Sequence, residues 1–313
     1  MKKVSILMSI YNESEREIGL SINSILEQTY KDIELIIVID NPKEKEKYLK
    51  LLEKYTLNYS NIIVSCNEEN IGLAMSMNKA FELSNGDYIA RMDADDISIK
   101  NRIEKEVNII ENHGYDFVFT GYSFIDEQDN LLSGTYKYYS PNEIYNSLLT
   151  TNCIHHPTVL MTREVFSRVG GYRDFPCSQD YDLWLRLLQA NCKFFMIDES
   201  LLKYRIRSNS TTSRKRFLQA CTLFYISNLF YERLQNGTDG YSKKNYDIFI
   251  KKCNTKYWFH KKYINYFQSV QKKLGKKKYI DFYLRLYLLS INKFIRDSYL
   301  LKIKIKKKGR LIL

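Results

Sequence analysis

The first hundred residues alternate short aliphatic runs with longer amphipathic segments, an order that few folds accommodate. The strand-length runs cover residues Val4–Ile10, Ile33–Ile39, 62–65 and 88–92. Segments of helical periodicity lie between them, at about residues 15–28, 43–55 and 73–84. Strands that alternate with helices predict a parallel sheet with right-handed crossovers and helices on both faces. The expected fold class is therefore α/β, and the first run is a buried strand.

Polar residues follow each of these four runs. Tyr11 and Asn12 come after the first run, Asp40 after the second, Asn70 after the third, and Asp93 opens an acidic stretch after the fourth. In parallel sheets, ligands bind beyond the carboxyl ends of the strands. Loops also favour Asn and Asp for turn formation, which is enough to explain any one of these positions. Acidic residues at two of the four ends, one of them a cluster, favour a binding site.

The acidic stretch reads Asp93-Ala94-Asp95-Asp96. Its carboxylates supply the hard oxygen ligands that Mg²⁺ or Mn²⁺ prefers, and a cation would relieve their mutual repulsion. Two other interpretations are a helix N-cap near Ser98 and a calcium loop. An EF-hand loop, however, needs Gly where Ser98 stands. We expect Asp93 and Asp95 to form a site for a divalent cation and a diphosphate.

Glycine-rich phosphate motifs do not follow the first run. A dinucleotide-binding fold would have Gly-x-Gly-x-x-Gly there, whereas this chain has Tyr11-Asn12-Glu13-Ser14, and no Walker motif occurs. The sheet thus presents carboxylates to a nucleotide, and a metal would hold the diphosphate.

In this order and spacing the motifs resemble the inverting glycosyltransferases of family 2, which have the GT-A fold. The resemblance is strongest to bacterial enzymes that build capsule, O-antigen or exopolysaccharide, and it covers roughly residues 1–210. Its fold would be a Rossmann-type mixed sheet flanked by helices. The matching stretches are VSILMSIYN at 4–12, SILEQTY at 24–30, ELIIVID at 34–40, NIGL at 70–73, GDYIARMDADD at 86–96 and QDYDLWLR at 179–186.

The resemblance implies a role for each matching residue. A set of polar residues would bind the nucleotide-sugar donor: Tyr11, Asn12, Asp40, Asn70, Asp93, Arg205 and Arg207. Tyr11 would pack near the base, and Asp40 would accept hydrogen bonds from the edge of the base. Asp95, together with Asp93, would hold the Mn²⁺ or Mg²⁺ cofactor. Asp180 would be the catalytic base.

The implied chemistry is one displacement at the anomeric carbon. A cation would neutralise the leaving nucleoside diphosphate while Asp180 takes a proton from the acceptor hydroxyl on the opposite face, which inverts the centre. Asp180 or Asp182 also fits a simpler role as a cap of the helix expected at 181–190. The chain departs from the family at Gln179, where Glu is usual, and at Arg207, where a cation-binding His is common. Arg offers only donors, so Arg207 would bind the diphosphate directly.

Other segments carry alternatives that the sequence leaves open. His155 and His156 are either ligands or hydrogen-bonding residues of a turn. Residues 170–172, Gly-Gly-Tyr, form either a flexible loop near the acceptor or an ordinary turn. Arg91 is either a charge partner of the acidic stretch or a solvated residue. A buried helix face is expected from Trp184, Leu185, Leu187 and Leu188.

Positive charge is concentrated at the C-terminal end. Residues 271–313 contain 14 Lys and Arg against 2 Asp and so carry the whole net charge of +12, while residues 1–270 are neutral. Apolar residues recur at helical spacing from Phe217 to Phe230, which predicts helices packed on the catalytic body. A further helix is expected at 283–295, between lysine runs at 276–278 and 306–308.

The basic tail has three interpretations. It fits a helix in the interface of an anionic membrane, or a core helix with solvated lysines. Nucleic-acid binding is the third. The resemblance favours the membrane, because such enzymes commonly act on lipid-linked sugars, and we expect no nucleic-acid partner.

We therefore expect a GT-A catalytic domain at residues 1–215, with a nucleotide-binding half at 1–100 and an acceptor half at 101–215, and a helical basic extension at 216–313. The expected activity is inverting transfer of a sugar from a nucleoside diphosphate donor to a hydroxyl of a lipid-linked glycan in surface polysaccharide biosynthesis. The expected donor is a UDP-sugar. The expected location is cytoplasmic and peripheral, at the inner face of the cell membrane. Six scattered cysteines without a Cys-x-x-Cys pair fit reduced thiols.

Two alternative functions make different demands on the sequence. A sugar-nucleotide nucleotidyltransferase would carry a Gly-rich basic loop after the first strand, where this chain has Glu13. A non-catalytic nucleotide- or carbohydrate-binding protein would not need Asp180 beside the acidic stretch.

Overall fold

The computed structural model describes residues 2–134, 136–207, 216–256 and 293–312. The chain divides into two compact units, Met1–Ser210 and Thr211–Leu313. We call them the catalytic unit and the C-terminal unit and describe each separately. The domain boundary expected after residue 215 falls beside residues 208–215, which lie outside the described residues.

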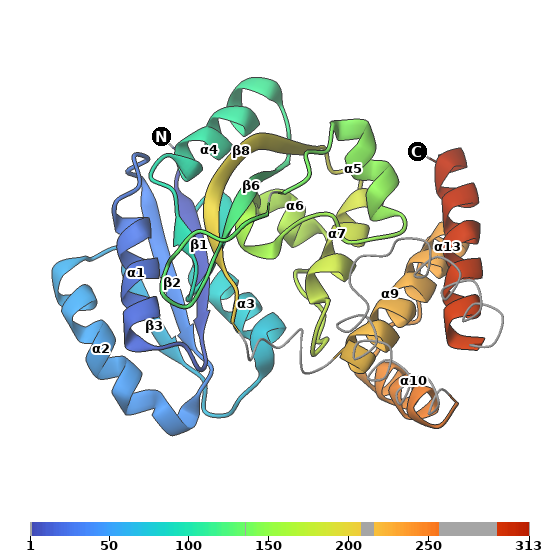
Figure 1. The fold of residues 1–313 in the computed structure, drawn as a ribbon, viewed down its shortest axis with the longest axis horizontal. Helices are drawn as coiled ribbons and strands as arrows, with labels where there is room; N and C mark the ends of the chain where they lie inside the picture. Colours follow the sequence, from blue (N-terminus) through green and yellow to red (C-terminus); the bar gives the residue numbers. More distant parts are fainter. Residues whose placement is uncertain (1, 135, 208–215, 257–292, 313) are drawn as a thin grey trace. The chain divides into compact units, whose positions relative to one another are not determined.

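The catalytic unit is built on an eight-stranded sheet with the order β3-β2-β1-β4-β7-β6-β8-β5 (Figure 1). Its strands are β1 Val4–Ile10, β2 Ile33–Ile39, β3 Ile62–Cys66, β4 Tyr88–Asp93, β5 Ile97–Ser98, β6 Phe117–Ile125, β7 Val159–Thr162 and β8 Phe194–Arg205. Strands β1 to β4 are parallel, as predicted. Ile10 pairs with Ile39 and Ser9 with Asp93, so these strands end at one edge of the sheet.

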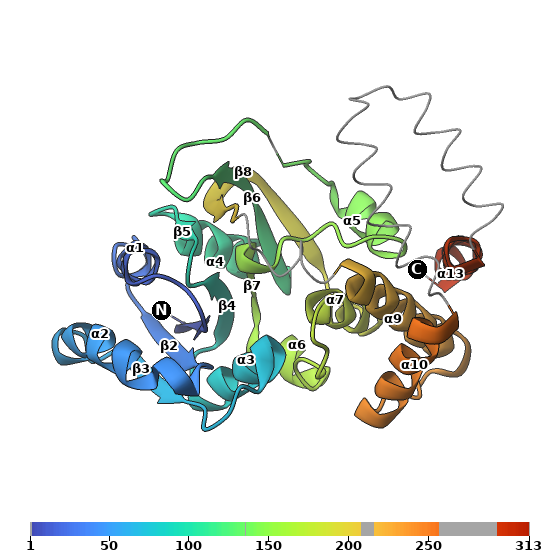
Figure 2. The same cartoon turned by 60° about the horizontal axis from the view of Figure 1, so that its bottom comes forward.

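Helices cover both faces of this sheet because its strands are apolar on both sides. The helices are α1 Glu15–Leu26, α2 Lys45–Asn58, α3 Gly72–Leu83, α4 Arg102–His113, α5 Pro141–Leu148, α6 Arg163–Arg168 and α7 Gln179–Gln189. One core cluster joins α1, α2 and α4 to alternate residues of β1, β2 and β4. Helices α3 and α6 pack on the other face (Figure 2). The period of two in a strand therefore decides which helix layer each side chain meets.

The second half of the sheet is mixed. Strand β7 runs antiparallel to both β4 and β6, whereas β6 and β8 are parallel. A register shift in β6 surrounds Gly121, and a Cβ there would stand 2.3 Å from the ring of Tyr136. The prediction of a parallel sheet is thus correct for β1 to β4, and the mixed sheet that the resemblance implies describes the whole.

The C-terminal unit is helical over its described residues. It contains α9 Arg216–Asn236, α10 Lys243–Lys256 and α13 Lys293–Ile312, and α9 packs against the other two. Tyr225, Leu229 and Phe230 of α9 are buried, as the helical spacing predicts. Most of the helix expected at 283–295 lies outside the described residues. Across the described part of the chain, every helix is too short or too polar to cross a membrane.

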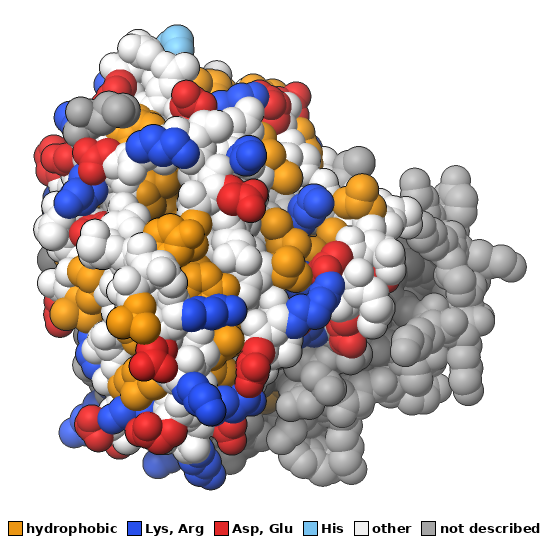
Figure 3. Space-filling view, turned by 90° about the vertical axis from the view of Figure 1, so that its left-hand side faces the viewer, with side chains coloured by type: hydrophobic (Ala, Val, Ile, Leu, Met, Phe, Trp, Pro, Cys, Tyr) orange, Lys and Arg blue, Asp and Glu red, His pale blue; other side chains and the backbone are white. Residues whose placement is uncertain are grey.

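Charged side chains of both signs are mixed on one face of the catalytic unit. The space-filling view shows lysine and arginine interspersed with aspartate and glutamate, with apolar atoms between them (Figure 3). This distribution agrees with the neutral balance of residues 1–270.

Candidate active site

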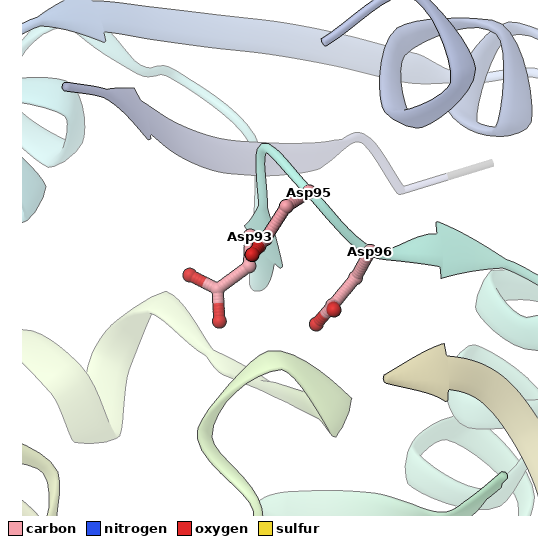
Figure 4. Close-up of side chains that lie close together, drawn as sticks. All are labelled: Asp93, Asp95 and Asp96. Atoms are coloured by element: carbon pink, nitrogen blue, oxygen red, sulfur yellow. The ribbon is translucent and has the colours of Figure 1, made fainter. Parts of the chain in front are cut away.

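Three carboxylates meet at the turn between β4 and β5. Asp93 ends β4, and Asp95 and Asp96 follow in the turn, closed by a 3.3 Å hydrogen bond from the Asp96 amide to the Asp93 carbonyl. One oxygen of each carboxylate lies within 4.8 Å of the others, and the three side chains point to the same side (Figure 4). Within the described residues this is the only group of three His, Cys, Asp or Glu side chains so arranged.

Burial and mutual repulsion perturb this cluster. Burial and the charge of Asp93 raise the pKa of Asp95 to about 7. Burial and the charge of Asp95 raise the pKa of Asp96. Asp96 is fully buried and accepts a hydrogen bond from the Arg205 amide at 2.9 Å, whereas the side chains of Asp93 and Asp95 are 30% and 21% exposed. Asp93 and Asp95 are therefore the pair that a divalent cation could reach.

Two arginines contact these carboxylates. Arg91, two residues before Asp93 on β4, is buried and forms an ion pair with Asp93, so of the two alternatives for Arg91 the structure shows the charge partner. Arg207 approaches Asp95, with Nε 2.9 Å from Oδ2. The guanidinium of Arg205 contacts none of these three carboxylates. It donates to the Asp95 carbonyl at 2.8 Å and pairs with Asp129 at 2.6 Å. Roles of Arg205 and Arg207 at a diphosphate stay predictions.

The Asp40 carboxylate is hydrogen-bonded to the backbone at the start of α3. Its two carboxylate oxygens accept hydrogen bonds from the amides of Ile71 and Gly72, each at 2.9 Å, and from the Asn67 side chain at 2.8 Å. The side-chain nitrogen of Asn70 donates to the Asp40 backbone carbonyl at 3.2 Å. Asp40 is 3% exposed, so its role at a base edge stays a prediction.

Tyr11 and Asn12 lie exposed after β1, beside Asp40. Asn41 joins them, because its side-chain nitrogen donates to the Tyr11 carbonyl at 2.6 Å and to Asn12 Oδ1 at 3.2 Å. The Tyr11 side chain is 46% exposed. An exposed ring beside the end of the sheet is free to stack on a planar ligand, and the structure brings Tyr11, Asn12, Asp40 and Asn70 to one edge.

Asp180 lies in the first turn of α7, half-buried. The helix begins after Ser178, which has a left-handed backbone with φ of 58°, so Asp180 is not the N-cap residue. Burial raises the pKa of Asp180, while the Tyr181 amide and the Asn152 side chain, 2.7 Å from Oδ2, act in the opposite direction. Gln179 is buried, and Trp184, Leu185, Leu187 and Leu188 are buried as predicted.

Tyr172 and Arg91 connect Asp180 to the acidic turn. Burial raises the pKa of Tyr172; Arg91 opposes this shift, and the charges of both Asp180 and Asp93 add to it. Burial raises the pKa of Asp180, and the charge of Arg91 is one of the smaller effects that oppose this rise. Carboxylates from β4 and α7 thus act on the same buried hydroxyl and the same guanidinium.

The two adjacent histidines contact aromatic side chains. His155 stacks on Tyr122 with ring centroids 4.0 Å apart, and burial lowers the pKa of His155 to about 4. His156 Nε2 lies 2.7 Å from the Tyr172 hydroxyl, and burial with the charge of Arg91 lowers the pKa of His156. Both rings are therefore neutral at pH 7. The group of carboxylates that could hold a metal contains neither of them.

The residues 170–172 are fixed in place. Asn78 of α3 accepts from the Tyr172 amide at 2.9 Å and donates to the Tyr172 carbonyl at 2.8 Å. The contributions of Asn78, Asn152 and Tyr172 could not be predicted from the sequence, because each residue acts through a contact between positions 16 to 94 residues apart. No local pattern marks an asparagine for such a contact.

The mixed sheet, the acidic turn after β4 and the carboxylate of α7 define a GT-A-type glycosyltransferase. Residues 5–170 match the family described as Glycosyl transferase family 2. The O-antigen biosynthesis glycosyltransferase WbnJ of Escherichia coli is 32% identical over 232 residues, which are 74% of this chain and 90% of that protein. The chain belongs to glycosyl transferase family 2.

Further comparisons agree with this assignment. The UDP-Glc:alpha-D-GlcNAc-diphosphoundecaprenol beta-1,3-glucosyltransferase WfgD of Escherichia coli is 32% identical over 68% of this chain and 80% of that protein. The crystal structure of S. aureus TarS 1-349 in complex with UDP-GlcNAc has a TM-score of 0.62 at 15% identity, over 99% of this chain and 90% of that one. A longer TarS structure is covered over 42% of its length. The mannosyltransferase PcManGT from Pyrobaculum calidifontis, in complex with GDP-Man and Mn2+, has a TM-score of 0.57 at 14% identity, over 99% and 86%.

Proposed function

We propose that this glycosyltransferase moves a sugar from a nucleoside diphosphate donor to a hydroxyl of a lipid-linked glycan, with inversion, in surface polysaccharide biosynthesis. The observation that carries the proposal is the cluster of Asp93, Asp95 and Asp96 at the turn after β4, within a chain that belongs to a glycosyltransferase family. A UDP-sugar is the expected donor. The UDP-Glc that the name of WfgD gives as its donor and the UDP-GlcNAc in the TarS complex support this choice.

The acidic turn fits a divalent cation. Its accessible ligand atoms are all carboxylate oxygens, which suit Mg²⁺ or Mn²⁺. Burial and then the charge of Asp93 raise the pKa of Asp95, and a bound cation would oppose both effects. Asp93 and Asp95 would hold the ion. Once bound, a cation neutralises charge on the departing diphosphate. The Mn2+ in the PcManGT complex supports this assignment.

Asp180 would act as the general base. A carboxylate that is half-buried, hydrogen-bonded by Asn152 and set at the positive end of α7 is held in one orientation while it stays able to take a proton. Tyr11, Asn12, Asp40 and Asn70 would bind the nucleotide, and Arg207 would contact the diphosphate. Deprotonation of the acceptor hydroxyl by Asp180 opposite the leaving group gives an inverted product.

The test is a screen of nucleotide-sugars with a lipid-linked acceptor, using chelator-treated protein with and without Mn²⁺. We expect cation-dependent transfer, a product of inverted anomeric configuration by NMR, and loss of turnover in Asp95→Ala. Glu53→Gln, at an exposed carboxylate of α2, is the control for a charge change and should leave turnover unaltered. A retained configuration, or full activity of Asp95→Ala, would contradict the proposal.

The same screen separates the two alternative functions. A nucleotidyltransferase would release pyrophosphate from a nucleoside triphosphate and a sugar phosphate. A non-catalytic binding protein would bind donor without turnover. Either result would contradict the proposed transfer of a sugar from a nucleoside diphosphate donor to a glycan.

We also propose that the enzyme works in the cytoplasm at the inner face of the cell membrane, with its basic tail on anionic lipid. Helix α13 supports this, because its exposed side chains combine apolar and basic groups. Tyr299, Leu300 and Ile303 are 54%, 49% and 36% exposed. Their neighbours Lys302, Lys304, Lys306 and Lys307 are exposed too. Such a surface gains from apolar insertion and from lipid charge together.

Vesicle flotation tests the membrane assignment. The protein should float with vesicles that contain phosphatidylglycerol and remain below with phosphatidylcholine alone. Replacing Tyr299, Leu300 and Ile303 with Ser should abolish flotation, whereas Ile248→Ser, at an exposed apolar residue of α10, should not. Flotation that survives the triple change, or RNA binding in its place, would remove α13 from this role.

A further inference from the structure

A chain of hydrogen bonds joins Lys79 of α3 to Asp40, the residue that follows β2. Lys79 Nζ donates to Asn67 Oδ1 at 2.9 Å and to the Cys66 carbonyl at 2.7 Å. Asn67 Nδ2 donates in turn to Asp40 Oδ1 at 2.8 Å and to Ser76 Oγ at 3.0 Å. Asp40, Asn67 and Ser76 are buried, and Lys79 is half-buried. The amide of Asn67 therefore lies between a cation and a carboxylate.

The two ends of this chain determine how the Asn67 amide is oriented. A lysine ammonium offers only donors, and an ionised carboxylate offers only acceptors. The amide oxygen must then face Lys79, and the amide nitrogen must face Asp40. An amide turned by 180° would present the wrong group to each neighbour, and both hydrogen bonds would be lost. The Lys79 ammonium thus decides which group Asn67 presents to Asp40.

The two oxygens of the Asp40 carboxylate accept different numbers of hydrogen bonds. Oδ1 accepts from Asn67 and from the amide of Ile71 at 2.9 Å. Among the residues that the structure describes, Oδ2 accepts only from the amide of Gly72, at 2.9 Å. A carboxylate oxygen accepts about two hydrogen bonds. The accepting capacity of Oδ1 is therefore used, and Oδ2 can accept from one more donor.

We propose that Lys79 and Asn67 are positioning residues for donor binding, which hold Asp40 so that its Oδ2 accepts an N–H group of the nucleobase. The inference rests on the proposed function, which places a nucleotide at Asp40. A carboxylate whose orientation is fixed beforehand needs no further ordering when the ligand binds. Because this carboxylate only accepts, it favours a base with a ring N–H at its pairing edge, as in uracil and guanine, over cytosine, whose ring nitrogen there carries no hydrogen.

Titration with UDP, GDP and CDP, with Mn²⁺ present throughout, tests this role. The parent should bind UDP or GDP most tightly, with a preference of about tenfold over CDP. Lys79→Met lets the Asn67 amide turn, so the preferred nucleotide should lose about fivefold in affinity while the Kd for CDP stays within about twofold. Lys79→Arg keeps a cationic donor and should keep most of the preference. Lys50→Met, at an exposed lysine of α2, is the control and should bind all three as the parent does.

A purely structural role of Lys79 predicts a different result. If Lys79→Met lowers the melting temperature and weakens UDP, GDP and CDP equally, Lys79 only supports the fold and the proposal is overturned. Tightest binding of CDP by the parent would overturn it as well. If Lys79→Met does not fold, Lys79→Gln provides the second test, because it keeps a donor without the charge. It should reduce the preference by about two- to fivefold, and an unchanged preference is equally contrary.

The titration needs neither an acceptor nor turnover, which separates this inference from the proposed function. A preference for UDP over CDP that depends on Lys79, in a protein that transfers no sugar, would contradict the proposed function alone. Binding of none of the three nucleotides would contradict both.

Discussion

The two halves of the catalytic unit hold their functional carboxylates in different ways. In residues 1–100, Asp40 and Asp93 stand at the ends of β2 and β4, which flank β1 in one parallel sheet. In residues 101–207, Asp180 stands in the first turn of α7 and is held by Asn152 from a distant loop. A carboxylate at a strand end takes its position from the sheet itself. The position of the Asp180 carboxylate depends instead on how α7 packs against two loops.

Under the proposed function, the first half would bind the donor and the second half would supply the base. We expect Asp180→Asn to lower transfer by about a thousandfold, since it removes the proton acceptor, while the Kd for nucleotide stays within about twofold. Single-turnover transfer and nucleotide titration measure the two quantities. Transfer within about tenfold of the parent would show that the acceptor half does not supply the base.

The contact between the halves at Asn78 can be broken with a matched pair of glycines. Gly170 and Gly171 both have positive φ, of 74° and 66°, but a Cβ on Gly171 would stand 2.7 Å from Asn78 Oδ1, whereas a Cβ on Gly170 meets nothing within 4 Å. Gly170→Ala should cost about 1 kcal/mol for its backbone. Gly171→Ala should cost about 2–3 kcal/mol, because it also displaces the acceptor of the Tyr172 amide. Urea denaturation measures both costs; equal values would show that Asn78 contributes nothing there.

The same contrast between strand ends and a helix with loops explains how much of each half could be predicted from the sequence. In the first half, β1 and β2 have the predicted bounds, and the edges of α1 and α3 differ from the prediction by one or two residues. Buried parallel strands are recognisable as aliphatic runs, and the polar residues after them mark the site. The acidic turn was therefore predictable from residues 88–96 alone.

In the second half, periodicity identified the buried face of α7 but not what surrounds Asp180. Tyr172 reaches His156 across 16 residues, and Asn152 reaches Asp180 across 28. These contacts depend on β7 entering the sheet antiparallel between β4 and β6. Strand order of this kind is set by tertiary packing, and local sequence carries little information about it.

The pH dependence of stability tests whether the acceptor half also keeps a neutral histidine. Burial lowers the pKa of His155 to about 4, below the value of about 6.5 in an unfolded chain. The unfolded state then binds the extra proton as the pH falls from about 6.5 towards 4, so folding stability declines over that interval. Between pH 7 and pH 5, the parent should lose about 1–2 kcal/mol more than His155→Phe, which keeps an aromatic ring against Tyr122. Equal losses of stability would mean that folding does not lower the pKa of His155 and that its ring is not buried.

The smallest expected effect comes from two serine caps, one in each half. Ser14 and Glu17 form a capping box at α1, and Ser140 and Glu143 form one at α5. Each Ser→Ala change should cost about 1 kcal/mol in denaturation. Only Glu17 also pairs with an arginine of the site, Arg207, at 3.2 Å. Ser14→Ala should therefore also raise the KM for donor, by about twofold, and Ser140→Ala should not. A KM change of equal size in both variants would mean that the cap of α1 has no special connection to the donor half.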